Sequence, residues 1–549
     1  MNGKMENNFN NFESNEYIGE GKDPFIDDRG KILNYYLNNK VNQVGLIDSK
    51  RGSVRGNHYH PDQLQTCILI KGSYISVTKN LEDDNDVIES RLIKEGEISI
   101  IKPNIAHTMV FIEDSVFINL VDGEREHENY GETHTFPLEI VDNFLAESIV
   151  ECFKDNCRVC NSRNLILIHS FGLSPLANNL VENKKSNATT YPLELNYCKD
   201  CNNIQLSIVV DPKILFDKYL YTSSTSQSFV DHFTELASNL IKEFNLGKES
   251  VVVDIGSNDG IFLKPLVDRN IKSIGVEPAT NLAIDANKNN LETINSYFDK
   301  KVVESIIQKY GKVDIVTAFN VFAHSDKLKD LANDAFSLLK KDGVFIIEVQ
   351  SLAEMIEKNL FDNVYHEHVN YWSLTNLVSF FEKLGFFVNN FQKVETHGGS
   401  LRLFISRKKK IKSAVSEYIK YEENLGLNQV DTFYSFSKKI IEQKNLALEN
   451  INNLKKSGKK IIFYGAPAKA TTLLNYYGIN SKLVQFTIED NPLKVGKYIP
   501  NTNIEIIDKE RAIKLDPDVI IVLAWNFYEV IKKDNQDIFP NAEFLKLDL

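Results

Sequence analysis

Short runs of alternating apolar and polar residues dominate the first part of the chain. They recur, with turns between them, from about residue 26 to residue 141, and few stretches there have helical spacing. Alternation with a period of two gives a strand one apolar and one polar side. The pattern predicts an all-β sandwich or barrel over residues 23–148, after a disordered, Asn- and Glu-rich segment over residues 1–22. The expected strands include Gln43–Ile47, Thr66–Ile70, Ser73–Val77, Ile98–Ile101 and Val116–Leu120.

A second pattern begins near residue 216, where apolar strands alternate with helical segments. This alternation predicts a doubly wound, Rossmann-like α/β sheet over residues 216–410. Residues 412–458 have mainly helical spacing, and further strands follow, so residues 411–549 are expected to form a C-terminal Rossmann-like α/β domain. The expected strands of the two domains are Val251–Ile255, Ser273–Val276, Asp314–Ala318, Gly343–Val349, Lys460–Tyr464, Val484–Ile488 and Asp518–Leu523.

Length and charge limit the possible functions. A chain of 549 residues is long enough for about three or four domains. Its 63 Lys and Arg against 75 Asp and Glu give a net charge of −12, which disfavours a nucleic-acid partner held through phosphates. No run of about twenty apolar residues could span a membrane, and the polar N-terminus lacks the apolar centre of a secretory signal. These features predict a soluble, cytoplasmic protein.

Two Cys-x-x-Cys pairs lie between the β region and the first α/β region, within residues 152–215. In a long chain without a secretory signal, this paired spacing indicates a metal site and not disulfides or isolated core thiols. Four thiolates can close the tetrahedral shell that Zn²⁺ prefers, and a closed shell implies a structural ion. Such an ion stabilises a segment too small to form its own core. The expected zinc ligands are Cys157, Cys160, Cys198 and Cys201.

The strand expected at Val251–Ile255 leads into the turn Asp254-Ile-Gly-Ser-Asn-Asp-Gly260. Glycines permit tight turning and close approach of a ligand at the carboxyl end of the strand. Glu277 ends the next strand, where its carboxylate could accept hydrogen bonds from a ribose diol. The turn is not Gly-x-Gly-x-x-Gly, so it resembles the first motif of S-adenosylmethionine-dependent methyltransferases more than a dinucleotide loop. The expected cofactor-binding residues here are Asp254, Gly256, Ser257, Asp259, Gly260 and Glu277.

Acid–base groups cluster in loops after later strands of the same domain. They are Tyr365–His368, together with His324. Imidazole titrates near neutrality and could remove a carbon-bound proton that an adjacent ketone has acidified, with a neighbouring carboxylate to orient it. Ligands bind at the carboxyl end of such a sheet, so two clusters there favour catalysis over a surface or core role. The segment Thr396–Arg402 adds backbone donors and a basic side chain that could hold a substrate.

The order of these stretches resembles that of the nucleotide-sugar C-methyltransferases that act on 4-keto-deoxyhexoses. That family combines a zinc-binding N-terminal module, an S-adenosylmethionine domain, and a C-terminal α/β domain that helps to hold the sugar nucleotide. The resemblance runs from about residue 157 to residue 549. The matching stretches are the two cysteine pairs, Tyr219–Ser224, Asp254–Gly260, Asn320–His324, Tyr365–His368, His397–Ser400, Tyr464–Lys469, Asp490–Gly496 and Ala524–Asn526.

The resemblance also implies roles for individual residues. His368 corresponds to the catalytic base, and Glu367, Tyr365 and His324 complete the site. Tyr219 is implied as a cofactor-binding residue. The implied substrate-binding residues are Tyr221, His397, Arg402 and Lys469.

The N-terminal β region carries a separate histidine pattern, Val54-Arg-Gly-Asn-His-Tyr-His60, followed by Gln65 and His107. His58, His60 and His107 with Gln65 could ligate a divalent ion. Alternatively, Arg55 binds a sugar-nucleotide phosphate and His58 acts as a base. The pattern resembles cupins, and in particular sugar-nucleotide 3,5-epimerases and 3,4-ketoisomerases.

Two points about this cupin remain open in the sequence. A regular strand would aim Arg55 and His58 to opposite faces, so a twist or bulge must re-aim one of them if both bind one substrate. A degenerate cupin could also serve only assembly, for example as the contact of a homodimer.

The leading prediction is a bifunctional enzyme of deoxysugar or surface-polysaccharide biosynthesis. It would C-methylate a nucleotide-linked 4-keto-deoxysugar, at carbon 3, with S-adenosylmethionine, and its cupin would epimerise or isomerise the same sugar. One alternative is an O- or N-methyltransferase acting on a sugar or small metabolite, with a non-catalytic cupin. Another is a non-catalytic, zinc-stabilised scaffold that binds a sugar nucleotide.

Overall fold

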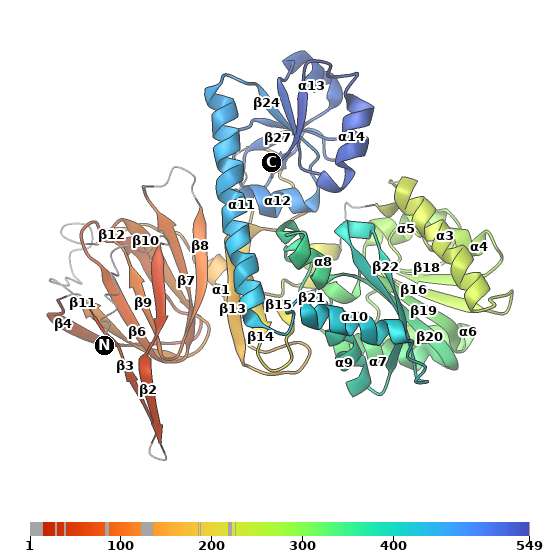
Figure 1. The fold of residues 1–549 in the computed structure, drawn as a ribbon, viewed down its shortest axis with the longest axis horizontal. Helices are drawn as coiled ribbons and strands as arrows, with labels where there is room; N and C mark the ends of the chain where they lie inside the picture. The colour runs from red at the N-terminus through yellow and green to blue at the C-terminus, as the bar shows by residue number, and fades with distance from the viewer. Residues whose placement is uncertain are drawn as a thin grey trace.

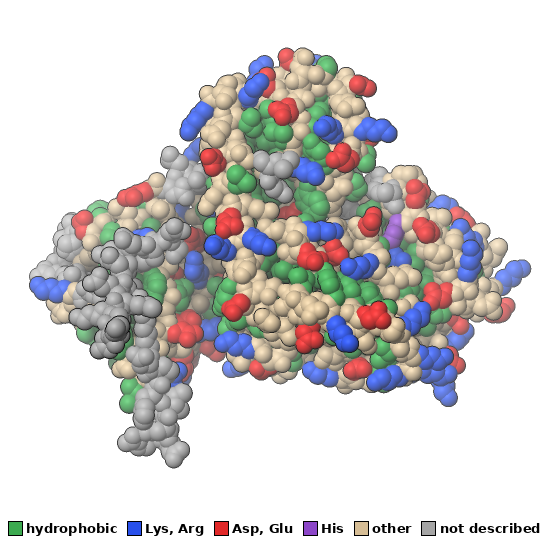
Figure 2. Space-filling view, viewed as in Figure 1, with side chains coloured by type: hydrophobic (Ala, Val, Ile, Leu, Met, Phe, Trp, Pro, Cys, Tyr) green, Lys and Arg blue, Asp and Glu red, His purple; other side chains and the backbone are tan. Residues whose placement is uncertain are grey.

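The computed structural model describes residues 15–27, 30–37, 40–82, 87–121, 135–184, 186, 188–217, 222–225 and 227–547. The N-terminal β domain lies at one end, the α/β domain containing β16 at the other, and the C-terminal domain above and between them (Figure 1). Acidic and basic side chains are interspersed over the face drawn in Figure 2. Among the described residues, no helix combines the length and apolar character needed to cross a membrane.

The N-terminal domain is a cupin-like barrel of two antiparallel sheets, as the alternating pattern predicted. One sheet has the order β1-β9-β6-β11-β4 and the other β12-β5-β10-β7-β8. Interior side chains such as Tyr74, Phe111 and Phe117 fill the space between them. The strands are β1 (Glu16–Glu20), β4 (Gln43–Ser49), β5 (Val54–Tyr59), β6 (Gln65–Lys71), β7 (Ser73–Asn80), β8 (Ile88–Lys94), β9 (Glu97–Ile101), β10 (Ile105–Phe111), β11 (Ser115–Val121) and β12 (Phe136–Pro137), with the hairpin β2 (Lys22–Asp27) and β3 (Gly30–Asn34) beside them.

The prediction of a disordered segment over residues 1–22 is wrong for its last part. Strand β1 pairs with β9 along its whole length, and it buries the Glu16 side chain against Ser99. Pairing to an existing edge supplies the backbone hydrogen bonds that a polar segment could not secure alone. Residues 1–14 lie outside the described residues.

The cysteine segment forms a small antiparallel sheet that is completed by a distant part of the chain. After α1 (Asn143–Cys152), strands β13 (Leu165–Pro175), β14 (Thr190–Cys198) and β15 (Ile204–Leu206) pair in order. The fourth strand, β21 (Asn370–Tyr371), follows the Tyr365–His368 loop and pairs with β15. The zinc-binding module is therefore continuous with the α/β domain through one sheet.

The α/β domain has a seven-stranded sheet of order β18-β17-β16-β19-β20-β23-β22. Neighbouring residues of a strand face opposite sides, so Val252 packs under α3 while Val253 faces α6 and α7. Helices on both sides confirm the doubly wound prediction. The elements are α3 (Gln227–Glu243), β16 (Val251–Ile255), α4 (Leu263–Val267), β17 (Lys272–Val276), α5 (Thr280–Lys288), β18 (Thr293–Ile294), α6 (Lys300–Tyr310), β19 (Val313–Phe319), α7 (Leu328–Leu338), β20 (Leu339–Gln350), α8 (Leu352–Glu357), α9 (Leu374–Lys383), β22 (Phe387–Val394) and β23 (Ser400–Ser406).

The C-terminal domain has a six-stranded sheet of order β26-β27-β25-β24-β28-β29. It is joined to the α/β domain by α10 (Ser413–Asn424) and by the long helix α11 (Val430–Lys456), which lies along β13 in Figure 1. The remaining elements are β24 (Ile461–Tyr464), α12 (Ala468–Tyr477), β25 (Phe486–Ile488), β26 (Tyr498–Ile499), β27 (Ile504–Ile507), α13 (Lys509–Leu515), β28 (Val519–Val522), α14 (Tyr528–Asn535) and β29 (Glu543–Lys546).

The cupin docks through its edge strand β8 against β13. Ser170 Oγ donates to Ser90 O at 2.5 Å. Gly172 has φ +74°, and a Cβ there would lie 2.1 Å from Ile88 O, so only glycine permits this approach. Glu194, on β14 near this interface, is buried and accepts a hydrogen bond from Ser207 Oγ at 2.8 Å.

Replacing Glu194 with Gln should remove a pH-dependent loss of stability. Burial raises the pKa of Glu194 from 4.5 to about 7. The neutral carboxyl is therefore favoured in the folded state, and this contribution is lost as the pH rises through about 7, by roughly 3 kcal/mol at most. Urea unfolding between pH 4.5 and 8.5 should show a flatter pH profile for Glu194→Gln. The exposed Glu147→Gln is the control. Parallel profiles for Glu194→Gln and wild type would contradict the assignment.

Candidate functional site

A cavity of about 1650 Å³ opens where the cysteine module, the α/β domain and the C-terminal domain meet. Its wall includes the turn after β16, the loop after β19 and residues of the Tyr365–His368 loop. The C-terminal turn around Gly465 closes another side. The cavity therefore lies at the carboxyl ends of the central parallel strands, where α/β sheets bind ligands.

The turn after β16 has the backbone that the sequence predicted. Gly256 has φ +66°, and a Cβ there would lie 2.4 Å from Val321 Cγ2. Gly260 has φ +84° and is as closely packed, against Leu291. Asp254 is buried and accepts a hydrogen bond from Thr317 Oγ1 at 2.6 Å, and burial raises its pKa to about 7. Asp254 thus anchors the turn to the next strand of the sheet.

Glu277 joins this turn to the end of β17. Its Oε2 accepts from Asn258 N and its Oε1 from Ala279 N, both at 2.8 Å. Each carboxylate oxygen has a further lone pair for a hydroxyl donor. Burial raises the pKa of Glu277. The carboxylate can hold both the turn and a ribose.

Two polar atoms beside Glu277 fit a polar cofactor. Ser257 Oγ and Asp259 Oδ1 are buried and have no hydrogen-bond partner in the part of the chain that the structure describes. Buried polar groups are normally satisfied, so these atoms indicate a ligand with donors and acceptors of its own. S-adenosylmethionine, with its hydroxyls and amine, has such groups. The cofactor-binding residue expected at Tyr219 lies outside the described residues.

The structure brings the predicted acid–base residues together. His368 and His324 have ring centroids 5.0 Å apart, and Tyr365 packs 4.0 Å from His368. His368 Nδ1 donates to Asn363 O at 2.8 Å, which leaves the lone pair of a neutral imidazole on Nε2. A fixed tautomer of this kind suits a general base.

Glu367 is oriented by a residue that the sequence did not single out. Asn178 Nδ2, from the segment between β13 and β14, donates to Glu367 Oε1 at 2.6 Å. Asn178 has no neighbouring motif, so nothing local marks it. His366, between Tyr365 and Glu367 in the sequence, points away from the cavity. Its Nε2 lies 3.2 Å from Pro192 O, and burial lowers its pKa to about 4. His366 is thus a core residue.

The predicted substrate-binding residues separate into two groups. Lys469 lines the cavity at the first turn of α12, with Nζ 4.7 Å from the centre of the Trp525 ring and without a hydrogen-bond partner among the described residues. Arg402 instead donates from Nη2 to Glu348 Oε2 at 2.8 Å and is not among the residues of the cavity wall. Tyr221 and the side chain of His397 lie outside the described part of the chain.

The four cysteines converge as expected for one metal ion. Their sulfur atoms all lie within 4.8 Å of one another, with Cys157 and Cys201 at 3.5 Å and Cys160 and Cys198 at 3.6 Å. Zn–S bonds of about 2.3 Å in a tetrahedron require sulfurs about 3.8 Å apart, so the cluster fits zinc. Each pair ends in a matching turn, where Asn161 and Asn202 have positive φ.

The cupin histidines also converge, on a different part of the molecule. The ligating atoms of His58, His60 and His107 lie within 4.8 Å of one another, and Gln65 Oε1 is 3.0 Å from His60 Nε2. His107 Nδ1 is 3.0 Å from Ile105 O, while its Nε2 is buried without a hydrogen-bond partner among the described residues. Metal ligation and acid–base chemistry are both compatible with this geometry.

Strand β5 contains a bulge of the kind expected if Arg55 and His58 bind one substrate. Gly56 and Asn57 have positive φ, and the register against β10 shifts there. His58 pairs with His107 and Arg55 with Met109, so the shift places Arg55 and His58 on one side of the sheet. The Arg55 guanidinium donates to Ser49 Oγ at 2.6 Å and to Asp48 O at 2.8 Å.

Comparisons with known proteins cover most of the chain. The family model "C-methyltransferase C-terminal domain" matches residues 395–544, "Methyltransferase domain" matches 228–389, and a zinc-binding domain model matches 157–216. The chain is 32% identical over 393 residues to the C-methyltransferase NovU of Streptomyces niveus, which covers 71% of this chain and 94% of that protein.

Solved structures match single domains. A dTDP-4-dehydrorhamnose 3,5-epimerase from Sulfolobus tokodaii is 23% identical and covers 23% of this chain and 77% of its own, with a TM-score of 0.20. The magnesium protoporphyrin IX methyltransferase of Synechocystis is 14% identical and covers 33% of this chain and 79% of its own, with a TM-score of 0.25.

Replacing Cys198 with Ser should remove the zinc and destabilise the protein. Purified wild type should contain about one tetrahedral zinc per chain, and the variant should contain far less, because three remaining ligands bind the ion weakly. Elemental analysis and thermal unfolding measure both effects. The buried Cys67→Ser, on β6 of the cupin, is the matched control and should keep its zinc. Wild type purified without chelators but free of zinc would refute the site.

Proposed function

This chain belongs to the C-methyltransferase family, and on that premise we propose that it methylates carbon 3 of a nucleotide-linked 4-keto-deoxysugar. The observation that carries the proposal is one cavity bounded both by the turn after β16 and by the Tyr365–His368 loop. Cofactor and acid–base groups then act on the same bound sugar. Such a product would serve deoxysugar or surface-polysaccharide biosynthesis.

The residues of the turn would hold the cofactor. Bound S-adenosylmethionine supplies an electrophilic methyl group on a sulfonium. Glu277 would accept hydrogen bonds from the ribose of S-adenosylmethionine. The buried Ser257 Oγ and Asp259 Oδ1 would form hydrogen bonds with other polar groups of the cofactor. The protein thereby orients the methyl group toward the sugar.

His368 would act as the base. A ketone at carbon 4 acidifies the proton on carbon 3, and Nε2 of His368 accepts that proton while Nδ1 stays fixed on Asn363 O. The electron pair released on carbon 3 would form the new carbon–carbon bond to the methyl as the sulfur–methyl bond breaks, and the electrons of that broken bond would stay on the sulfur of the departing thioether. Tyr365 and His324, packed against His368, would provide polar hydrogens near the enolate oxygen.

The C-terminal domain would hold the nucleotide diphosphate. Lys469 lies in the first turn of α12. Its ammonium group and the helix N-terminus would therefore both attract an anion. Lys469 Nζ has no hydrogen-bond partner among the described residues, and burial lowers its pKa. A phosphate oxygen would satisfy it and favour its charged form.

His368→Asn or Glu367→Gln should lower turnover at least about a hundredfold, because each removes an acid–base or orienting group. Binding of S-adenosylmethionine, measured by calorimetry, should change less than about twofold, since the turn after β16 is intact. Product mass spectrometry with dTDP-, CDP- and GDP-linked keto sugars measures turnover. His366→Asn, whose ring faces Pro192, is the control. Near-normal turnover would remove the base assignment, and a methyl found on oxygen would favour an O-methyltransferase.

For the cupin, we propose epimerisation or isomerisation of the same sugar. The bulge in β5 supports this, since it puts Arg55 and His58 on one side of the sheet. His58 would move a ring proton, and Arg55 would contact a phosphate. The rival is a divalent metal held by the histidine cluster and Gln65, which the buried Nε2 of His107 favours. A purely dimerising cupin would use the exposed Val44 and Leu46 on edge strand β4.

The full-length chain without S-adenosylmethionine should exchange ring protons of the keto sugar with deuterated solvent, and His58→Asn should abolish this exchange. Proton NMR measures the exchange, and His368→Asn removes any contribution from the other site. Elemental analysis of the same samples tests the rival: a second metal per chain that His58→Asn removes would support metal binding. Equal exchange in wild type and His58→Asn would contradict the assignment of His58.

A further inference from the structure

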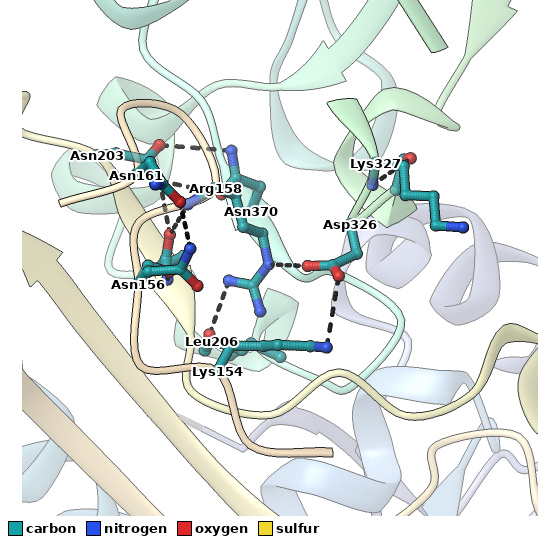
Figure 3. A network of polar contacts seen from close by, with 11 residues as sticks. Lys154, Asn156, Arg158, Asn161, Asn203, Leu206, Asp326, Lys327 and Asn370 are labelled. Carbon is teal, nitrogen blue, oxygen red and sulfur yellow. Dashed lines mark hydrogen bonds and ion pairs between the residues drawn. The ribbon is translucent and has the colours of Figure 1, made fainter. Parts of the chain in front are cut away.

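Arg158 lies between Cys157 and Cys160 in the sequence. Its side chain extends from the cysteine module to Asp326 of the α/β domain (Figure 3). Its side chain is 2% exposed. Arg158 N donates to Gln205 Oε1 at 2.9 Å, and Nη1 donates to Leu206 O at 2.8 Å. The zinc site and β15 together therefore fix both the backbone and the side chain of this arginine.

The partner of Arg158 is Asp326, in the loop between β19 and α7. Arg158 Nε donates to Asp326 Oδ1 at 2.9 Å, and Lys154 Nζ lies 3.8 Å from Oδ2 (Figure 3). Among the described residues, Asp326 is the carboxylate within ion-pair distance of Arg158. Asp326 lines the cavity and follows His324 by one intervening residue.

The same loop presents His324 to His368. Its helical turn, Phe322–His324, buries Phe322 and Ala323 in the core, and the His324 ring stacks on Phe216 at 5.7 Å and contacts His368 at 5.0 Å. The apolar side chains anchor one end of the loop. The ion pair anchors the other end, directly beyond His324.

An ion pair whose cation is buried is a costly way to join two elements. Desolvation of Arg158 offsets much of the attraction, and apolar residues of similar volume would pack as well. The pair adds a fixed orientation, because a planar guanidinium that also donates to Leu206 O holds the Asp326 carboxylate in one position. Direction matters where a displacement of about 1 Å can cost a hundredfold in rate.

We propose that Arg158 is a positioning residue for methyl transfer: through Asp326 it holds the loop that sets His324 against His368. The zinc module thereby contributes to the geometry of the acid–base site as well as to folding. This inference rests on the proposed function, since His324 is assigned there to the reaction.

Arg158→Met should lower kcat about ten- to a hundredfold, while KM for S-adenosylmethionine changes less than about twofold and zinc stays at one per chain. Methionine keeps much of the volume and removes the buried charge, while the Asp326 carboxylate stays 30% exposed and 3.8 Å from Lys154 Nζ. The control is Arg163→Met, which removes an exposed ion pair of the same module, with Asp155 at 3.0 Å. It should leave all three quantities unchanged.

A double variant distinguishes positioning from general stabilisation. If Arg158 acts through His324, then Arg158→Met should cause little further loss of kcat in a His324→Asn background. Losses that multiply, or a wild-type kcat in Arg158→Met, would overturn the proposal. Asp326→Asn should reproduce the kcat loss with zinc retained, and a normal kcat in that variant would equally overturn it.

Hydrogen exchange provides a readout that needs no substrate. In Arg158→Met, amides of residues 320–327 should exchange faster than in wild type, while those of β16 should not change. If wild type methylates no keto sugar, the proposed function fails. The exchange result still tests whether the Arg158–Asp326 ion pair holds the loop. Unchanged exchange in residues 320–327 would overturn the inference even where product forms.

Discussion

Backbone pairing between β15 and β21 is the interaction on which the candidate active site depends. Ile204 pairs with Tyr371, and Leu206 N donates to Val369 O at 3.1 Å. Val369 follows His368 directly, so this short ladder fixes the end of the acid–base loop. The other side of β15 pairs with β14, which ends at Cys198 of the cysteine cluster. The sheet of the cysteine module therefore supports a loop of the α/β domain.

Two further contacts to the acid–base loop and the segment before it come from outside the α/β domain. Asn178 orients Glu367 from the cysteine module, and the Trp525 indole of the C-terminal domain donates to Asp362, close to the same loop. Side chains locked by second contacts hold catalytic geometry better than loops left to themselves. The cavity therefore exists only when three parts of the chain are assembled.

The cupin relates to this assembly differently. It docks by one strand edge, at β8 and β13, and its histidine cluster lies on its own sheet between β5 and β10. Among the described residues, those of the cavity wall all lie outside the cupin strands. The histidine cluster of the cupin and the cavity therefore lie on separate parts of the chain.

The sequence by itself determined the features that local chemistry specifies. Strand and helix periodicity located several strands in each of the three large domains, because burial of one face imposes a period on neighbouring residues. Cysteine spacing identified four ligands that converge within 4.8 Å. The glycines at 256 and 260 predicted a tight turn, and both adopt a positive φ at which other residues are strained.

Only the tertiary structure decided which distant residues meet. Arg402 was expected to bind the substrate. It instead forms an ion pair with Glu348, its cross-strand neighbour on β20. His366 and His368 are two residues apart, yet one faces Pro192 O and the other contacts His324. The segment Glu16–Glu20 forms strand β1 because it pairs with strand β9. Such pairings join segments far apart in the chain, so they leave no period or spacing in the sequence, and only the packed fold determines them.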